Sequence, residues 1–348
     1  MSELRWNPLL RTWTMVASNR KLRPNMPKDW CPFCPGDGSH VPADYEVYAY
    51  DNDFPALTQT PDAPYEDPTG FYQSAENYGK CEVILYSPQH TIKFYELSVD
   101  HIVKLLNLVA ERCTALSQDP KIQYVFPFEN KGEAVGVTMP HPHGQLYGYS
   151  FVPQKIVTEL ESAKAYYKES GNCLFCAMNR AELEAGSRIV AENDSFLAYI
   201  PFFTDYPYGV FVVAKRHIGM LSDCTAAERR DLAKILKALT KGFDGLFQKP
   251  FPYMMVYHQR PVNCDAYKDS GEYYHFHIEF YPPLRDADKI KYYASSEMGA
   301  WAAANTSAVE ETAPVLRRLV AMATAEIDAA SSNDADSSHD GKDCSERR

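Results

Sequence analysis

The feature that most constrains this chain is an ordered set of cysteine, histidine and secondary-structure signals that occurs twice. In each half a Cys-x-x-Cys pair is followed by a strand-like run with a lone histidine near its end, an amphipathic helical pattern, a second strand and a His-x-His strand. A single succession of this kind has little weight alone. Two successions in the same order predict a duplicated module, and therefore two tandem units of one fold.

The two successions use matching positions about half a chain apart. The first half supplies Cys31, Cys34, His90, His141 and His143, and the second supplies Cys173, Cys176, His217, His275 and His277. Apolar residues three or four positions apart predict helices over residues 102–109 and 232–239. Strands are expected at residues 81–90, 123–126 and 141–145, and again at 209–217, 253–257 and 275–279.

Each Cys-x-x-Cys pair supplies half of a tetrahedral metal shell, and each half of the chain offers two histidines to complete it. The predicted quartets are Cys31, Cys34, His90 and His141, and Cys173, Cys176, His217 and His275. A redox pair is the alternative, but Pro35-Gly36 after the first pair disfavours the helix that a thioredoxin-like motif needs. Closed four-ligand shells predict structural zinc, two ions per chain.

The strand His141-Pro142-His143-Gly144-Gln145 has the residue types of a nucleophilic site. Alternate residues of a strand share one face, so His141, His143 and Gln145 are expected to point together. With His141 bound to zinc, His143 remains as a neutral imidazole, which is a competent nucleophile near pH 7. Gln145 can donate to a phosphoryl oxygen without adding charge. Gly144 is expected to leave the backbone open to an approaching phosphate.

Only the first module is expected to carry chemistry. In the second module Ile278 stands where the first has Gly144, so a bulky side chain is expected to fill the approach. Glu279 stands where the first has Gln145, and its negative charge would repel a phosphate. The second module is therefore interpreted as a scaffold.

Two runs of the first half carry a resemblance to a known family. They are Phe128-Glu129-Asn130-Lys131-Gly132 and Thr138-Met139-Pro140-His141-Pro142-His143-Gly144-Gln145. The chain resembles the galactose-1-phosphate uridylyltransferases of the histidine-triad superfamily, and the similarity extends from Asn7-Pro8-Leu9 to about Leu319. The resemblance implies an α+β fold of two tandem histidine-triad-like modules, each an antiparallel sheet shaped as a half-barrel with packed helices.

The expected modules cover residues 1–162 and 163–330. A final helix is predicted over residues 315–327, where the apolar periodicity is clear. Residues 331–348 are rich in Ser, Asp and Lys and lack such a pattern, so they are expected to form a disordered tail.

The resemblance also implies roles for individual residues. His143 would be the nucleophile that forms a uridylyl-imidazole intermediate, and Gln145 would hold the phosphoryl group. The positions implied to contact the nucleotide sugar are Arg20, Arg23, Asn52, Asp53, Asn130, Gly136, Val137 and Thr138. The positions implied to reach the hexose across a dimer are Lys291, Tyr292 and Glu297, which implies a homodimer. Ser296 and Ala303 stand where the best-known members have a tyrosine and a glutamine.

Some members of that family carry an iron site made of a glutamate and three histidines. Glu159, His258 and His277 match three of these positions, and Glu279 takes the place of the remaining histidine. Those members lack the second cysteine pair, which this chain retains. A second zinc is therefore favoured over iron, and His258 is interpreted as a structural histidine, with metal ligation left open.

The charge of the chain limits its partners. Its 46 acidic and 35 basic residues leave a net charge of −11, which disfavours nucleic acid as a partner. With no apolar run of about 18 residues and no apolar stretch typical of a signal peptide, a cytoplasmic protein without membrane contact is expected. The predicted function is uridylyl transfer between UDP-glucose and galactose 1-phosphate. The alternatives are a related transferase or phosphorylase acting on ADP-sugars or dinucleoside polyphosphates, and a zinc-stabilised nucleotide-binding module without turnover.

Overall fold

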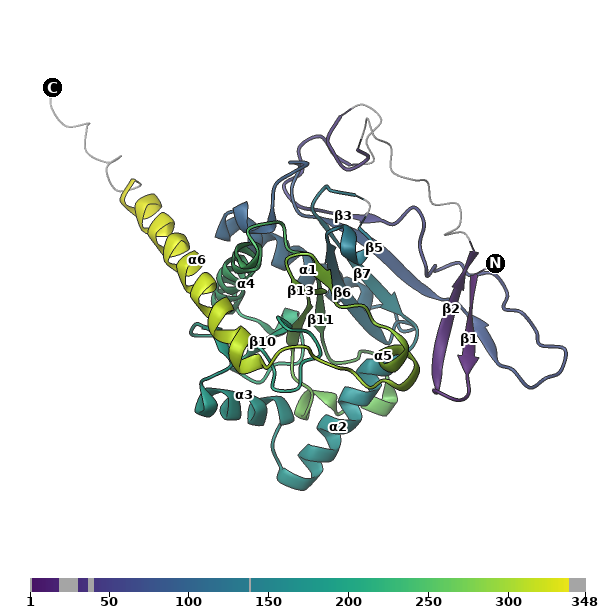
Figure 1. Cartoon of the computed structure of the whole chain (residues 1–348). Helices are drawn as coiled ribbons and strands as arrows, with labels where there is room; N and C mark the ends of the chain where they lie inside the picture. The colour runs from purple at the N-terminus through teal and green to yellow at the C-terminus, as the bar shows by residue number, and fades with distance from the viewer. Residues whose placement is uncertain (1, 19–30, 37–40, 138, 338–348) are drawn as a thin grey trace.

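Nine strands from both halves of the chain form one antiparallel sheet in the computed structural model, which describes residues 2–18, 31–36, 41–137 and 139–337 (Figure 1). The first half contributes β3 (Tyr48–Asp51), β5 (Gly79–Leu85), β6 (Tyr124–Lys131) and β7 (His143–Tyr149). The second half contributes β8 (Ile189–Glu192), β9 (Phe196–Tyr199), β10 (Val210–Ala214), β11 (Tyr253–His258) and β12 (His277–Tyr281). Their order across the sheet is β3-β5-β7-β6-β11-β12-β10-β9-β8.

This strand order is symmetric about its centre. From the centre outward, the first half runs β6-β7-β5-β3 and the second runs β11-β12-β10-β9, so these eight strands form four matching pairs, and β8 is an additional edge strand of the second half. The symmetry agrees with the duplication that the repeated motif predicts. The two sheets expected of separate half-barrels are instead joined, because β6 pairs with β11 through Phe128 opposite Val256 and Glu129 opposite Met255. This pairing removes two sheet edges whose backbone groups would otherwise lack strand partners.

Three long helices pack against one face of the sheet. They are α1 (Val99–Ser117), α4 (Ala226–Leu246) and α6 (Val309–Ser337). The predicted helices at 102–109 and 232–239 lie inside α1 and α4, whose buried residues recur every three or four positions. The Ser98 hydroxyl caps α1 by accepting from the His101 amide at 3.1 Å, and the Thr225 hydroxyl caps α4 in the same way. The main hydrophobic core lies between these helices and the sheet.

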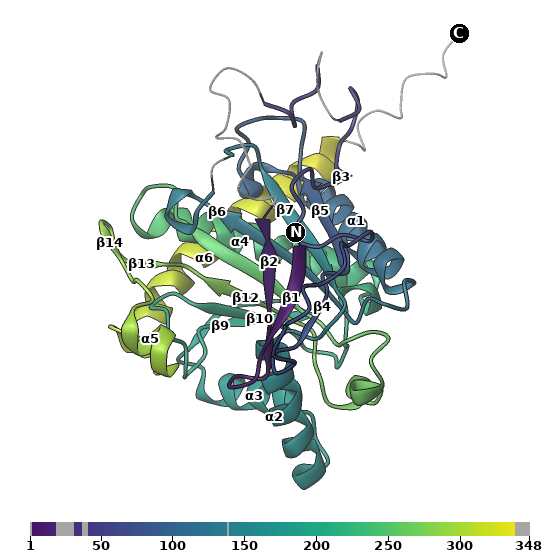
Figure 2. The same ribbon diagram turned by 90° about the vertical axis from the view of Figure 1, so that its right-hand side faces the viewer.

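The opposite face of the sheet carries α2 (Gln154–Ser170), α3 (Leu174–Ala185) and a small sheet of β1 (Ser2–Asn7), β2 (Thr12–Ala17) and β4 (Ser74–Glu76) (Figure 2). A short hairpin of β13 (Leu284–Asp286) and β14 (Lys289–Ile290) precedes α5 (Ser295–Ala300). The helix α2 runs unbroken through residues 162 and 163. The expected boundary between the modules therefore falls inside a helix that follows directly on the first half and leads into the second.

The carboxy-terminal helix is longer than the sequence predicts. The predicted helix starts at residue 315, directly after Pro314, whereas α6 starts at Val309. Val309 and Ala313 before the proline and Leu316 after it are all buried, so one apolar stripe continues across Pro314. Packing of this stripe against the core explains why the helix extends past a residue that usually ends one.

The start expected for the disordered tail, residue 331, lies inside a helix. Residues 331–337 belong to α6, and residues 338–348 lie outside the described part of the chain. Among the described residues, no helix combines the length and the apolar character that a bilayer crossing requires.

Candidate active site and metal sites

The first predicted metal quartet is assembled in the structure. The ligand atoms of Cys31, Cys34, His90 and His141 all lie within 4.8 Å of one another. The Sγ atom of Cys34 lies 3.3 Å from Nδ1 of His90 and 3.5 Å from Nδ1 of His141, and Cys31 Sγ lies 3.7 Å from the same His141 atom. These distances match the sulfur–nitrogen edge of a zinc tetrahedron, about 3.6 Å for ordinary bond lengths.

The second quartet has the same geometry. Cys173, Cys176, His217 and His275 also place their ligand atoms within 4.8 Å of one another. The Sγ atom of Cys176 lies 3.8 Å from Nδ1 of His217 and 3.5 Å from Nδ1 of His275. Cys173 Sγ lies 3.7 Å from Nδ1 of His275. Both duplicated clusters can therefore hold a metal ion, as their sequence spacing predicts.

Backbone carbonyls orient the histidines of these clusters. Nε2 of His141 donates to the Ser87 carbonyl at 2.8 Å, and Nε2 of His275 donates to the Ala214 carbonyl at 2.9 Å. A proton on Nε2 leaves the lone pair on Nδ1, which faces the cysteines. Burial lowers the pKa of His141 to about 4, so this imidazole is neutral at pH 7, the form that binds a metal.

A phenylalanine between the two cysteines of each pair packs against the histidine strand. The ring of Phe33 lies 5.9 Å from the His141 ring and 5.7 Å from the His143 ring. In the second half the Phe175 ring lies 4.5 Å from the His277 ring. In each half, the phenylalanine between the two cysteines therefore contacts the second histidine of the His-x-His strand. Residue type and spacing alone do not reveal this role, although both pairs share the phenylalanine immediately before the second cysteine.

His143 is the first residue of β7, and His141 precedes the strand rather than belonging to it. His143 is half-buried, whereas His141 is fully buried in the metal cluster. Nδ1 of His143 donates to the His141 carbonyl at 2.8 Å. Because Nδ1 carries the proton, Nε2 of the neutral ring carries the lone pair, and this is the nitrogen that can act as a nucleophile.

Gln145 lies two residues along β7, on the same face of the strand as His143. The Tyr147 hydroxyl donates to Oε1 of Gln145 at 3.2 Å. This contact fixes the amide so that its NH₂ group is directed away from Tyr147 and can donate to an anionic oxygen. Tyr147 is a second orienting residue that the sequence pattern did not reveal.

The expectation for Gly144 is wrong. This residue is buried and faces the side of the sheet covered by helices, where a Cβ atom would lie 2.6 Å from the Tyr86 hydroxyl and 3.1 Å from the Phe128 carbonyl. The glycine makes room for Tyr86, not for a phosphate. In the second half, Ala214 corresponds to Tyr86 and Ile278 corresponds to Gly144 in the strand register. The large residue of this pair is therefore on β12 in the second half, whereas in the first half it follows β5. Ile278 lies in the core and blocks no approach to His277.

We expect Gly144→Ala to lower both the stability and the turnover of the enzyme. The added methyl group forces Tyr86 or β7 to move, and overpacking of this kind costs about 1–3 kcal/mol. Denaturant unfolding measures the first effect and the rate of the catalysed reaction measures the second. The double variant with Tyr86→Phe removes the clashing hydroxyl, so it should recover part of the lost stability. Additive effects in this cycle would contradict the proposed contact.

Tyr86 belongs to a buried polar network beneath the nucleophile strand. Its hydroxyl donates to Oε2 of Glu129 at 3.1 Å, and the Tyr253 hydroxyl donates to Oε1 at 3.2 Å. Burial raises the pKa of Glu129 to about 7, although Lys131 and the two tyrosines act in the opposite direction. This carboxyl group therefore changes its charge close to neutral pH.

Glu129→Gln should change how stability depends on pH. In the unfolded chain Glu129 ionises near pH 4.5, whereas in the folded protein it keeps its proton until about pH 7. The wild type consequently loses stability as the pH rises between these two values, and a glutamine at this position does not. Urea unfolding at pH 5 and pH 8 should show the variant gaining up to about 3 kcal/mol relative to the wild type. An equal difference at both pH values would contradict the raised pKa.

A cavity of about 350 Å³ lies beside His143. Its lining includes Asn130 and Val137, two of the positions implied to contact the nucleotide sugar, together with Lys93 and Lys131. Asn130 lies at the level of His143, because Phe128 pairs with Gln145 in the antiparallel ladder. The cavity thus combines the His143 imidazole and the Asn130 amide with two lysines and with the carboxyl groups of Glu129 and Glu133.

The remaining first-half positions lie at two places. Asn52 and Asp53 follow β3, where the Asn52 side chain accepts from the Phe54 amide at 2.9 Å and the Tyr50 hydroxyl donates to Asp53. The ring of Tyr50 lies 5.7 Å from the Phe33 ring, and Phe33 in turn contacts the His143 ring. Gly136 ends a short 3-10 helix with a φ of 80° and directly precedes Val137. Arg20, Arg23 and Thr138 lie outside the described residues.

The carboxy-terminal positions do not join the cavity beside His143. Lys291 donates to the Asp205 carbonyl in the second half, with its Nζ 5.3 Å from the centre of the Tyr206 ring. Tyr292 is 74% exposed, and Glu297 accepts from the Ala294 amide in the first turn of α5. None of the three lines the cavity in this single chain. Within one chain, these three positions are therefore separate from His143.

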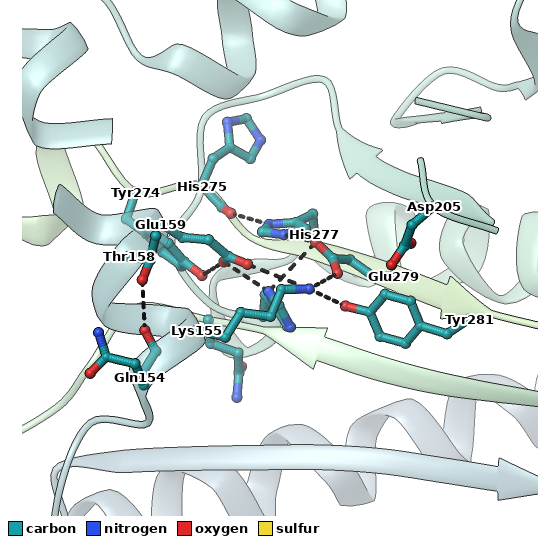
Figure 3. A network of polar contacts seen from close by, with 12 residues as sticks. Gln154, Lys155, Thr158, Glu159, Asp205, Tyr274, His275, His277, Glu279 and Tyr281 are labelled. Carbon is teal, nitrogen blue, oxygen red and sulfur yellow. Dashed lines mark hydrogen bonds and ion pairs between the residues drawn. The ribbon is translucent and has the colours of Figure 1, made fainter. Parts of the chain in front are cut away.

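The second His-x-His strand differs from the first at its second histidine. His277 is fully buried, its Nδ1 donates to the His275 carbonyl at 2.9 Å, and its Nε2 lies 3.2 Å from Oε1 of Glu279 (Figure 3). Both ring nitrogens are therefore engaged by oxygen acceptors, whereas a nucleophile needs an available lone pair. The full burial of His277 and the carboxylate at position 279, and not the side chain of Ile278, therefore distinguish the second half from the first.

A third group of side chains that could bind a metal ion includes His277. Glu159 from α2, His258 from β11, and His277 and Glu279 from β12 place their ligand atoms within 4.8 Å of one another. These include the three positions at which the family resemblance implies iron. Nδ1 of His258 donates to Oε2 of Glu159 at 2.9 Å.

Comparison with known proteins agrees with the fold. Residues 1–153 match the N-terminal domain of galactose-1-phosphate uridyl transferase, and residues 159–326 match its C-terminal domain. The chain belongs to this family. Its two matched domains meet at the start of α2, ahead of the boundary expected at residues 162 and 163.

Named relatives in the family cover most of the chain. The galactose-1-phosphate uridylyltransferase of Thermotoga maritima is 38% identical over 318 residues, which are 91% of this chain and 98% of the relative. That of Saccharomyces cerevisiae is 31% identical and covers 85% and 89%. A solved uridylyltransferase structure superposes with a TM-score of 0.83 at 30% identity, covering 92% of this chain and 99% of that chain. An ADP-glucose phosphorylase from Arabidopsis thaliana shares the fold, with a TM-score of 0.68 at 23% identity.

Proposed function

We propose that this family member transfers a uridylyl group between UDP-glucose and galactose 1-phosphate, with His143 as the covalent nucleophile. The observation that supports this proposal most directly is the hydrogen bond from Nδ1 of His143 to the His141 carbonyl. It places the lone pair on Nε2, and it becomes stronger when the ring acquires positive charge on attack. The relatives named as galactose-1-phosphate uridylyltransferases support the substrate pair.

The reaction proceeds in two displacements. Nε2 of His143 attacks the α-phosphorus of UDP-glucose, a phosphorus–nitrogen bond forms, and the bond to the glucose 1-phosphate oxygen breaks. A phosphate oxygen of galactose 1-phosphate then attacks the uridylyl-histidine, which releases UDP-galactose and the neutral imidazole. The Gln145 amide, oriented by Tyr147, donates to a non-bridging phosphoryl oxygen in both steps. A sugar phosphate leaves as a stable anion, so no acid is needed at position 145.

The nucleotide-sugar contacts are proposed from the matching positions. Asn130 and Val137 line the cavity beside His143, and Asn52 and Asp53 lie at the end of a strand in the same sheet. We assign the same role to Arg20, Arg23, Gly136 and Thr138 on the family pattern. Lys93 and Lys131 also line this cavity, and the Lys131 ammonium pairs with Asp244 at 2.7 Å.

The hexose contacts require a second subunit in this proposal. Lys291, Tyr292 and Glu297 lie away from the cavity of their own chain, and Tyr292, Met298 and Trp301 leave large apolar side chains exposed. Exposed aromatic and methionine side chains of this kind are typical of protein interfaces. A homodimer in which each carboxy-terminal segment reaches the partner's site accounts for both observations. Light scattering in solution should give the mass of two chains.

We further propose that the two Cys₂His₂ clusters each hold a structural zinc ion. Their donor types, closed four-ligand shells and oriented imidazoles fit zinc. The first zinc ion supports the nucleophile through Phe33, and neither ion takes part in the displacement steps.

A labelling experiment tests the proposed function. The purified protein is incubated with UDP-glucose labelled in the uridylyl group, denatured, and treated separately with acid and base. A label that survives base but not acid is expected, because it identifies a phosphoramidate on histidine. A protein that retains no label is a binding module, and stronger labelling by ADP-glucose than by UDP-glucose would identify a related nucleotidyltransferase instead.

A further inference from the structure

The group formed by Glu159, His258, His277 and Glu279 is where the family resemblance implies iron. Two glutamates and two histidines are chemically able to bind a divalent metal ion. The contacts between them, however, have the lengths of hydrogen bonds. His258 Nδ1 lies 2.9 Å from Glu159 Oε2, which is the length of an ordinary nitrogen–oxygen hydrogen bond. The Tyr274 hydroxyl donates to the same Glu159 oxygen at 2.7 Å.

A lysine supplies a positive charge at this group. Nζ of Lys155 lies 2.6 Å from Oε2 of Glu279 and 3.8 Å from Oε1 of Glu159, and it also donates to the Tyr281 hydroxyl (Figure 3). The Glu279 side chain is 2% exposed, so its negative charge needs a partner. The Lys155 side chain is about half-exposed and lines a pocket of about 450 Å³ together with Glu159 and Glu279.

The three residues of this charge balance come from two elements of the fold. Lys155 and Glu159 lie one turn apart on α2, the helix that connects the two halves, and Glu279 lies on β12, next to the central strand β11. His258 on the neighbouring strand β11 joins Glu159 to the sheet. The group therefore holds α2 against the middle of the nine-stranded sheet.

The two cysteine clusters provide a contrast inside the same molecule. There, thiolates and imidazole Nδ1 atoms converge at the spacing of a zinc shell. At the third group each carboxylate already accepts hydrogen bonds from an imidazole and faces an ammonium group. A divalent ion placed among these carboxylates would have to displace the Lys155 ammonium or bear its repulsion.

We propose that the Lys155 ammonium is the resident cation of this group and takes the place of a metal ion, so that the third group remains metal-free. Lys155 and Glu279 form an ion pair, in which the carboxylate at position 279 neutralises the ammonium at position 155. The contacts that hold α2 against the sheet then need no metal, and they should persist when the metal content of the protein changes.

The metal content of three variants tests this proposal. Wild-type protein and Lys155→Met, Lys155→Arg and Lys164→Met variants are incubated under argon with Zn²⁺ or Fe²⁺, dialysed, and measured by elemental analysis. Lys164 is a matched control, because it lies on the same helix and pairs with Asp269 at the surface. We expect one additional equivalent of metal in Lys155→Met alone, since only that variant frees both carboxylates.

Thermal unfolding gives a readout that does not depend on metal binding. Without added metal, Lys155→Met should have a lower Tm than the wild type, whereas Lys155→Arg and Lys164→Met should stay close to it. Added Zn²⁺ should raise the Tm of Lys155→Met selectively. The proposal is wrong if wild-type protein holds a third metal that Glu279→Gln removes. It is equally wrong if Lys155→Met keeps both the metal content and the Tm of the wild type.

Discussion

The exchange of label between UDP-glucose and glucose 1-phosphate should fall by about 10⁴-fold or more in His143→Ala, as expected for loss of a covalent nucleophile. The fold should remain intact, because His143 is not among the four ligands of either cysteine cluster. Exchange kinetics measure the loss, and an unchanged metal content with an unchanged circular dichroism spectrum shows that the structure is preserved. Exchange at a near wild-type rate in this variant would exclude the proposed mechanism.

The duplicated strand offers a matched control for this experiment. His277 occupies the position of His143 in the second half, and its Nε2 is engaged by Glu279. His277→Asn should therefore leave the covalent uridylyl label on the protein, even if stability decreases. A folded His277→Asn protein that no longer accepts the label would place the chemistry in the second half.

The two cysteine clusters differ in their contact with the active site, because Phe33 of the first cluster contacts His143 and Phe175 of the second contacts His277. Cys173→Ser combined with Cys176→Ser should remove one of two zinc ions and lower the free energy of unfolding by several kcal/mol, on the order of 5. Most of the activity of the folded fraction should remain, since Phe175 contacts His277 and not His143. Elemental analysis, urea unfolding and exchange kinetics at low temperature measure the three quantities.

The equivalent change in the first half should have a different outcome. Cys31→Ser combined with Cys34→Ser removes the other zinc ion, but it also releases the segment that holds Phe33 against His143. The free energy of unfolding and the rate of label exchange between UDP-glucose and glucose 1-phosphate should therefore both fall in this variant. Equal activity of the folded fractions of the two double variants would contradict the connection through Phe33.

Much of the candidate site followed from the sequence because its information is local. The order of cysteines and histidines in each half predicts which four side chains form each cluster, and the structure brings both sets together. The alternation of a strand places His143 and Gln145 on one face, as β7 does. Such patterns depend only on residue type and spacing, so they can be recognised before any tertiary contact is known.

What only the tertiary structure decided depends on which distant segments meet. Neither β6 nor β11 carries a signal that they pair and turn two sheets into one, since strand partners depend on packing across the whole molecule. The need for a glycine at position 144 comes from Tyr86, which lies 58 residues earlier in the chain. The pairing of Lys155 with Glu279 spans 124 residues and gives a metal-like group an ammonium. In each case the residue types were visible in the sequence, but their roles follow from contacts that only the folded chain creates.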